Sequence, residues 1–138
     1  MPSTLIDSIF FKDLYGTDEM RAVFGDLSLL QKWLDTEVAL AKAEAELGLA
    51  PQWAADEIAR KGRAELLDTA AIKRGIDQTV HPIVPMIRAF DAVCENGAGE
   101  FIHWGATTQD IMDPASVLQI KDAIALFEPR LHMLADVL

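Results

Sequence analysis

Eight consecutive residues, 103–110, bring together side-chain types that can bind an anion and move a proton. The segment reads His-Trp-Gly-Ala-Thr-Thr-Gln-Asp, so it offers an imidazole, two hydroxyls, an amide and a carboxylate where a turn leads into a helix. The free N–H groups and the dipole of a helix N-terminus attract carboxylate or phosphate, and threonine hydroxyls add donors without adding charge. The segment therefore predicts a small anion site.

The same residues also have a purely structural interpretation. Thr107 with Asp110 three residues later is a capping box, which satisfies free N–H groups at a helix start. His103 can be a hydrogen-bonded loop histidine, and His81, which precedes Pro82, can be a capping or turn residue. On spacing alone the structural interpretation is favoured, because a short motif needs a structural context.

Composition limits the class of protein. The chain has 138 residues, of which 51% are hydrophobic, and this suits one folded domain. A formal net charge of -10, with basic residues scattered among carboxylates, argues against a nucleic-acid or anionic-membrane partner. The lone Cys94 excludes an internal disulfide framework, and residues 1–4 lack the basic flank of a signal peptide. We expect a cytoplasmic protein without a metal or cofactor.

Helical periodicity accounts for nearly the whole chain, so we expect an all-α fold. Caps and breakers divide the chain into helices: Thr17 to Gly25, a capping box of Ser28 and Gln31 leading to Gly48, Pro51 to Gly62, Asp68 to Gly75, and Pro82 to Asn96-Gly97. The second of these helices has an apolar face made of Leu30, Leu34, Val38, Ala41 and Ala45.

A final helical run carries the most regular apolar pattern. Its apolar residues alternate spacings of three and four, which is a heptad seam that packs against neighbouring long helices: Val117, Ile120, Ile124, Phe127, Leu131, Leu134 and Leu138. No capping signal precedes Leu138, so we expect truncation within a bundle helix. Because proline is tolerated in a first turn, Pro114 predicts a helix start at about 111–113, and Pro129 predicts a kink near 125–128.

Several segments, taken in order, resemble the N-terminal portion of the fumarase/aspartase superfamily. The branch is that of adenylosuccinate lyase and 3-carboxy-cis,cis-muconate cycloisomerase. The resemblance rests on residues 15–20, the helix with Trp-Leu-Asp-Thr-Glu at 33–37, the His81 junction, and residues 103–113. It implies an N-terminal helical domain, 1–110, that leads into a long-helix bundle domain beginning at 111. It also implies a homotetramer whose active sites are shared between subunits.

The resemblance implies a chemistry as well. In this family a proton is removed next to a carboxylate of a polycarboxylate substrate, an aci-carboxylate dianion forms, and the β-substituent then departs. By position, Thr107 and Thr108 match a Thr-Ser pair that holds a substrate carboxylate. Gln109 lines the same loop, and Asp110 matches the acidic residue that organises it.

Two histidines are the candidate catalytic residues. His103 matches the histidine of this region, near the substrate, and His81 aligns with a histidine proposed as a general acid in adenylosuccinate lyases. Histidine suits proton transfer near neutral pH. The resemblance leaves open which of the two transfers a proton.

Three positions depart from the family pattern. Leu14 precedes Tyr15 where adenylosuccinate lyases commonly carry a phosphate-binding arginine, and a leucine cannot hold a nucleotide phosphate. The Thr-Ser pair is Thr-Thr in this chain, and the usual Asp-Thr at the start of the long helix is Asp113-Pro114. The first departure weighs against a nucleotide substrate.

We therefore expect the N-terminal part of a lyase that performs β-elimination on a succinyl-type polycarboxylate and releases fumarate. A lactonising 3-carboxy-cis,cis-muconate cycloisomerase is the alternative on the same fold. A non-catalytic helical assembly module is the alternative from another class. The family's second histidine region and its serine loop do not occur in these residues, so we expect the chain alone to be inactive.

Overall fold

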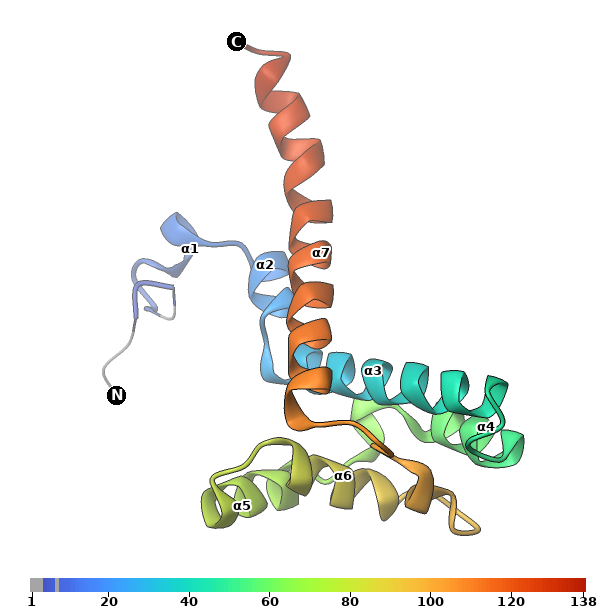
Figure 1. Ribbon diagram of the computed structural model, residues 1–138. Helices are drawn as coiled ribbons and strands as arrows, with labels where there is room; N and C mark the ends of the chain where they lie inside the picture. The colour runs from blue at the N-terminus through green and yellow to red at the C-terminus, as the bar shows by residue number, and fades with distance from the viewer. Residues whose placement is uncertain (1–3, 7) are drawn as a thin grey trace.

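The computed structural model describes residues 4–6 and 8–138, and within these residues it contains helices and no strand. The elements in chain order are α1 (Lys12–Tyr15), α2 (Asp18–Val23), α3 (Asp26–Glu46), α4 (Gln52–Lys61), η1 (Ala64–Leu66), α5 (Thr69–Thr79), α6 (Ile83–Asp91), η2 (Ala98–Phe101) and α7 (Thr108–Ala135). The all-α prediction is confirmed. Figure 1 shows α7 rising as one long helix from a base of α3 to α6, with α2 beside it.

The core lies between α3, α4 and α6, beneath the first turns of α7. Its largest fully buried apolar side chains are Leu34, Ile58, Ile83, Met86, Phe90 and Ile111. Cys94 packs against this cluster, as predicted, and burial raises the pKa of its thiol to about 11. Because only the thiolate is a good nucleophile, Cys94 acts as a small packing residue at neutral pH.

The buried face of α3 differs from the predicted one. It consists of Leu30, Leu34, Glu37, Ala41 and Glu44, which recur every three or four residues as one stripe. The predicted residues Val38 and Ala45 pack against the core from beside this stripe and are half-buried. Two glutamates occupy positions that an amphipathic helix gives to apolar side chains.

Both buried glutamates are energetically unfavourable in the ionised form. Glu37 is 1% exposed and Glu44 is 8% exposed, and the Oε2 atom of each has no hydrogen-bond partner among the described residues. Burial raises the pKa of each carboxyl above its ordinary value, because desolvation disfavours the charged form. A hydrogen bond from His103 opposes that rise in the pKa of Glu37.

Local signals placed several helix ends correctly. Thr17 accepts the N–H of Met20 at the start of α2, and Asp68 accepts the N–H of Ala71 at the start of α5. Gly62 follows the last residue of α4, as predicted. Gly48, just beyond α3, has a φ of 73°, a left-handed conformation in which glycine is unstrained.

Tertiary contacts moved other ends. The predicted capping box of Ser28 and Gln31 is wrong, because α3 begins at Asp26 and Gln31 instead donates to the Gly62 carbonyl (2.9 Å) and accepts from the Ala64 N–H (2.8 Å). The predicted end of α5 at Gly75 is also wrong.

That helix continues through Gly75 to Thr79. A Cβ atom at Gly75 would lie 2.7 Å from Pro85 Cβ, so this glycine permits close packing of α5 on α6. The helix predicted from Pro82 to Asn96-Gly97 is shorter, ending at Asp91.

The long helix α7 begins at Thr108, earlier than the predicted start at 111–113. The predicted start assumed that Pro114 had to lie in the first turn, but the capping interaction of Thr107 with Asp110 sets the start and places Pro114 inside the helix. The helix also continues through Pro129, and Figure 1 shows its last turns inclined to the turns below. The proposed domain boundary at 110/111 falls inside this helix and stays a prediction.

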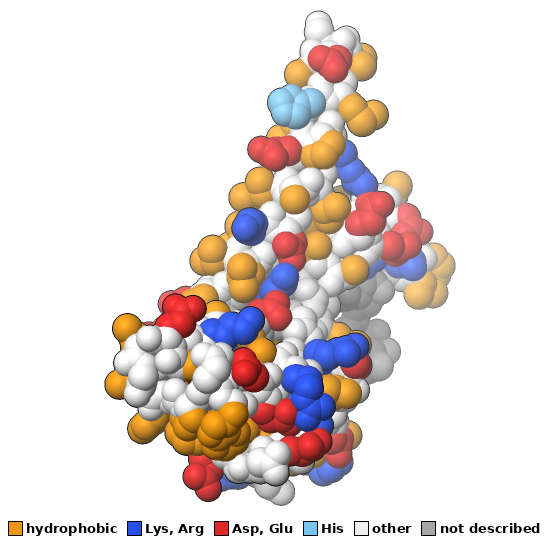
Figure 2. Space-filling model, turned by 90° about the vertical axis from the view of Figure 1, so that its right-hand side faces the viewer, with side chains coloured by type: hydrophobic (Ala, Val, Ile, Leu, Met, Phe, Trp, Pro, Cys, Tyr) orange, Lys and Arg blue, Asp and Glu red, His pale blue; other side chains and the backbone are white. Residues whose placement is uncertain are grey.

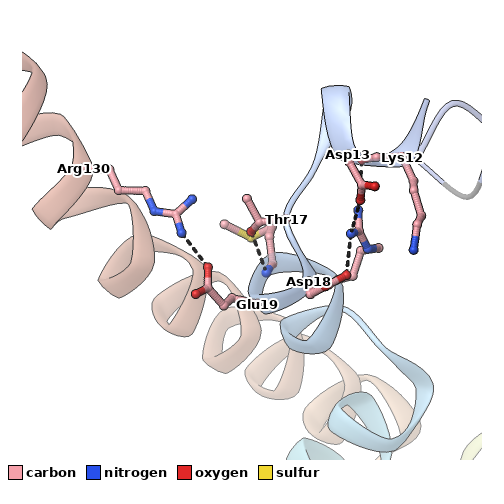
Figure 3. Close-up of polar contacts among 8 residues, drawn as sticks. Lys12, Asp13, Thr17, Asp18, Glu19 and Arg130 are labelled. Carbon is pink, nitrogen blue, oxygen red and sulfur yellow. Dashed lines mark hydrogen bonds and ion pairs between the residues drawn. The ribbon is translucent and has the colours of Figure 1, made fainter. Parts of the chain in front are cut away.

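Polar contacts attach α7 to the elements beside it. Gln119, which is buried, donates to the Val23 carbonyl at 2.8 Å, and Lys32 of α3 pairs with Asp122 at 2.7 Å. Higher on the helix, Arg130 pairs with Glu19 of α2 (Figure 3). These contacts fix the direction in which α7 leaves the base.

The heptad seam of α7 is exposed along its whole length. Each of its residues, from Val117 to Leu138, is more than half exposed, and Figure 2 shows hydrophobic side chains gathered along this projecting helix. The face that packs on the rest of the chain is a different one, made of Ile111, Ala115, Gln119 and Ala123. Within the described part of the chain, no helix is both long and apolar enough to cross a lipid bilayer.

Shortening a side chain should lower the free energy of unfolding more when that side chain is buried in the core than when it is exposed. Leu34 is fully buried, so Leu34→Ala should lower the free energy of unfolding by about 2–5 kcal/mol through lost burial and a cavity. Leu47, at the end of α3, is 75% exposed, and Leu47→Ala is the matched control, with little expected change. Urea unfolding followed by circular dichroism measures both, and equal losses would contradict this core assignment.

Neutralising Glu44 should stabilise the chain in a pH-dependent way. Because the folded-state pKa of Glu44 is raised, the stabilisation from protonating it is complete below the unfolded pKa of 4.5 and is lost as pH rises through the folded pKa. Glu44→Gln, which carries no charge at either pH, should therefore raise the urea midpoint at pH 7 and change it little near pH 4. Equal destabilisation at both pH values would contradict the prediction.

Candidate active site

The first turn of α7 is held by a capping interaction between Thr107 and Asp110. The Thr107 N–H donates to Asp110 Oδ2 at 2.8 Å, and the Thr107 hydroxyl donates to the same oxygen at 2.9 Å. The backbone bond, followed by the hydroxyl bond, lowers the pKa of Asp110. The predicted capping box is thus formed, and Asp110 is the residue that organises the start of this helix.

His81 reaches this helix start from the connection between α5 and α6. Its Nε2 atom lies 2.9 Å from Thr108 Oγ1, and its Nδ1 atom accepts the Val84 N–H at 3.3 Å. Val80, in a left-handed conformation with a φ of 53°, turns the chain just before it. His81 therefore caps α6, as its structural interpretation predicts, and also contacts α7, while its predicted role in proton transfer stays a prediction.

His103 contacts a buried carboxylate of α3. Its Nδ1 atom lies 2.7 Å from Glu37 Oε1, and the imidazole is mostly buried. The backbone of His103 is left-handed, with a φ of 62°, which is uncommon for a residue with a side chain. The loop before α7 is thus held in an unusual conformation that places the imidazole on Glu37.

Sequence reasoning missed Glu37 as the partner of His103. The signal was present, because Glu37 and Glu44 follow Leu30 and Leu34 at heptad spacing on the buried side of α3. A glutamate at such a position is rarely buried without a partner. That spacing could have identified Glu37 as a polar residue with a specific role.

The structure joins four of the predicted site residues in two pairs. His81 contacts Thr108, Thr107 contacts Asp110, and His103, on the loop before α7, contacts Glu37. Gln109 is exposed and donates to Asp113, one turn further along α7. No contact among the described residues joins Gln109 to either histidine.

The groups at the start of α7 and on the loop before it suit an organic anion. They are the His81 imidazole, the Thr108 hydroxyl that faces it, the N-terminal N–H groups of a long helix, and the His103 imidazole of the preceding loop. Uncharged donors of this kind hold a carboxylate and can stabilise charge that develops on it. Among the described residues, no group of three or more histidine, cysteine, aspartate or glutamate side chains is arranged to hold a metal ion.

Comparison with known proteins gives consistent relatives, although no family model matches the chain. An adenylosuccinate lyase from Methanocaldococcus jannaschii is 48% identical over 124 residues, covering 90% of this chain and 27% of that protein. An N-acetyl-S-(2-succino)cysteine lyase from Enterococcus italicus is 44% identical, covering 89% of this chain and 27% of its own length. A 3-carboxy-cis,cis-muconate cycloisomerase from Pseudomonas putida is 39% identical, covering 93% and 31%.

Solved structures agree with the sequence relatives. A 3-carboxy-cis,cis-muconate lactonizing enzyme from Pseudomonas putida superposes with a TM-score of 0.86 at 39% identity, over 94% of this chain and 30% of that one. A fumarate lyase from Mesorhizobium sp. BNC1 gives 0.77 at 40% identity, over 83% and 27%. The chain spans less than a third of the length of these relatives. In sequence and in fold, the chain belongs to the fumarate lyase superfamily, and it matches the N-terminal portion of the members of that superfamily.

Proposed function

We propose that this chain forms the N-terminal part of a lyase that performs β-elimination on a succinyl-type polycarboxylate and releases fumarate. The observation that carries the proposal is the contact of His81 with Thr108 at the start of α7, the helix that follows the loop of His103. Two relatives, adenylosuccinate lyase and N-acetyl-S-(2-succino)cysteine lyase, are named for compounds that carry a succinate-derived group. A carboxylate of such a group is the natural ligand for the hydrogen-bond donors at the start of α7.

The chemistry requires the site to hold a growing negative charge. In a β-elimination, one carbon loses a proton to a base, the bond from the neighbouring carbon to the leaving group breaks, and a C=C bond forms. Charge builds on the carboxylate beside the deprotonated carbon, so donors aimed at its oxygens lower the barrier. Thr107, Thr108, Gln109 and Asp110 would form and organise that carboxylate subsite, with His81 and His103 as the candidate proton carriers.

A cycloisomerase acting on 3-carboxy-cis,cis-muconate is the second candidate. The lactonizing enzyme of Pseudomonas putida matches 94% of the chain with a TM-score of 0.86. Leu14, where adenylosuccinate lyases commonly carry a phosphate-binding arginine, is 77% exposed and offers no donor to a nucleotide phosphate. Leu14 weighs against adenylosuccinate cleavage, whereas the sequence identity is higher to an adenylosuccinate lyase, at 48%, than to a cycloisomerase, at 39%.

We also propose a homotetramer with active sites shared between subunits, acting on a small molecule in the cytoplasm. The exposed heptad seam of α7 supports assembly, because an apolar stripe of this length is normally covered by other helices. The single cysteine fits a reducing compartment, and the net charge of -10 disfavours nucleic acid and anionic membrane as partners. No cofactor is needed for this elimination.

Removing the two threonine hydroxyls should impair catalysis in the longer protein of which we propose this chain is a part. Thr107→Val with Thr108→Val should raise KM and lower kcat, because the Thr108 donor to the carboxylate is lost together with the Thr107 hydroxyl bond that holds Asp110 at the start of α7. Ultraviolet absorbance follows either fumarate release from a succinyl amine or the consumption of carboxymuconate.

Ser116→Ala is the matched control for this variant. Ser116 lies on the same helix, is exposed, and donates only to the Met112 carbonyl, so its loss should leave both constants unchanged. Unchanged kinetics in the double threonine variant would refute the carboxylate subsite. If the unmodified protein turns over neither substrate, both candidate reactions fail.

The 138-residue chain by itself should show no turnover. It covers only 27% of the adenylosuccinate lyase relative, so it can supply at most part of a complete site. The same absorbance assay, with the chain at high concentration, measures this directly. Turnover of any succinyl substrate by the isolated chain would show that residues outside it are unnecessary.

A further inference from the structure

We propose that the two site histidines are held in opposite tautomers, which gives them different roles. His81 is a fixed donor that orients the Thr108 hydroxyl toward a substrate carboxylate, and Glu37 positions His103 so that the lone pair of its Nε2 atom is free to accept a hydrogen bond. The substrate part of this statement rests on the proposed function. The tautomers follow from the hydrogen bonds alone.

The partners of His81 determine its tautomer. Its Nδ1 atom accepts the Val84 N–H at 3.3 Å, so this nitrogen must carry a lone pair and the ring proton must lie on Nε2. Nε2 then donates to Thr108 Oγ1 at 2.9 Å. Because the oxygen accepts this bond, the threonine O–H is free to turn toward a carboxylate. Protonating His81 at Nδ1 would break the bond to Val84, so this ring is a poor proton carrier.

The partner of His103 imposes the opposite tautomer. Its Nδ1 atom lies 2.7 Å from Glu37 Oε1, a short distance typical of an N–H donating to a carboxylate. A proton shared by an imidazole and a carboxyl group resides on the imidazole, which is the stronger base. Nε2 of His103 therefore carries the lone pair, and among the described residues it has no hydrogen-bond partner. This nitrogen can accept a hydrogen bond while the bond to Glu37 remains intact.

Glu37 holds the His103 ring in place. It is 1% exposed, its hydrogen-bond partner among the described residues is His103, and its Oε2 atom has no partner there. A buried carboxylate oxygen that accepts the Nδ1–H fixes both the orientation and the tautomer of the ring. Glu37 is thus a positioning residue that acts through His103.

Nuclear magnetic resonance tests the tautomers without any substrate. Long-range ¹H–¹⁵N correlation of the ¹⁵N-labelled 138-residue chain at pH 8.5 reports which ring nitrogen of each histidine is protonated. The chain has three histidines, and His132→Gln identifies the exposed one. We expect the Nε2–H tautomer for His81 and the Nδ1–H tautomer for His103. The same tautomer at both residues would overturn the proposal.

Two matched substitutions on α3 test the role of Glu37. Glu37→Gln replaces a charged acceptor with a neutral one, so the ratio of Nδ1–H to Nε2–H at His103 should fall by about tenfold or more. Glu44→Gln is the same change on the same buried face and should leave that ratio unchanged. An unchanged ratio in Glu37→Gln would overturn the positioning role.

The native chain keeps the proposal testable if Glu37→Gln does not fold. An Nε2–H tautomer at His103 would mean that a protonated Glu37 donates to the ring, and this also overturns the proposal. These outcomes are independent of turnover, so they are distinguishable from a failure of the proposed lyase or cycloisomerase activity.

Discussion

The packing of α7 across α3 is the contact on which the other features of this molecule depend. Ile111 and Ala115, in the first turns of α7, are buried, and Ala115 allows a close approach. The ion pair of Lys32 with Asp122 fixes the direction of the helix above this contact. As a result, the N-terminus of α7 lies against the loop that carries His103 and within reach of His81.

That packing has an energetic cost, which is concentrated in the buried carboxylates of α3. A hydrophobic stripe that included leucine in place of Glu37 and Glu44 would bury more apolar area without desolvating charge. Glu37 gains a hydrogen bond from His103 in return, and this bond places an imidazole at the start of α7. Strain and buried charge are commonly retained where they position functional groups, and the left-handed backbone of His103 belongs to the same pattern.

The apolar side of α7 connects the fold to the size of the chain. Its seam residues, between Val117 and Leu138, are more than half exposed, although other apolar residues of the same helix are buried on α3. A contiguous exposed stripe of this kind normally marks an interface. The chain also spans less than a third of the length of the lyase and cycloisomerase relatives.

The sequence by itself determined those features that depend on residues within about one helical turn of each other. The all-α class, the caps at Thr17, Asp68 and Thr107, and the seam of α7 all follow from such local spacing. Two of the errors arose where a distant contact overrode a local signal. Gln31 bonds to Gly62 and Ala64 instead of capping α3. Gly75 does not end α5, and the close approach of Pro85 is the reason that a glycine stands there.

The candidate site was predicted as a set of residues but not as an arrangement. Its members came from the resemblance at 103–110 and at His81, yet the partners that orient them are 27 and 66 positions apart in the sequence, for His81 with Thr108 and for His103 with Glu37. Only helix packing brings such residues within hydrogen-bond distance. Local spacing therefore determined where a helix could begin and which groups could bind an anion, whereas the tertiary structure decided which nitrogen of each histidine faces its partner.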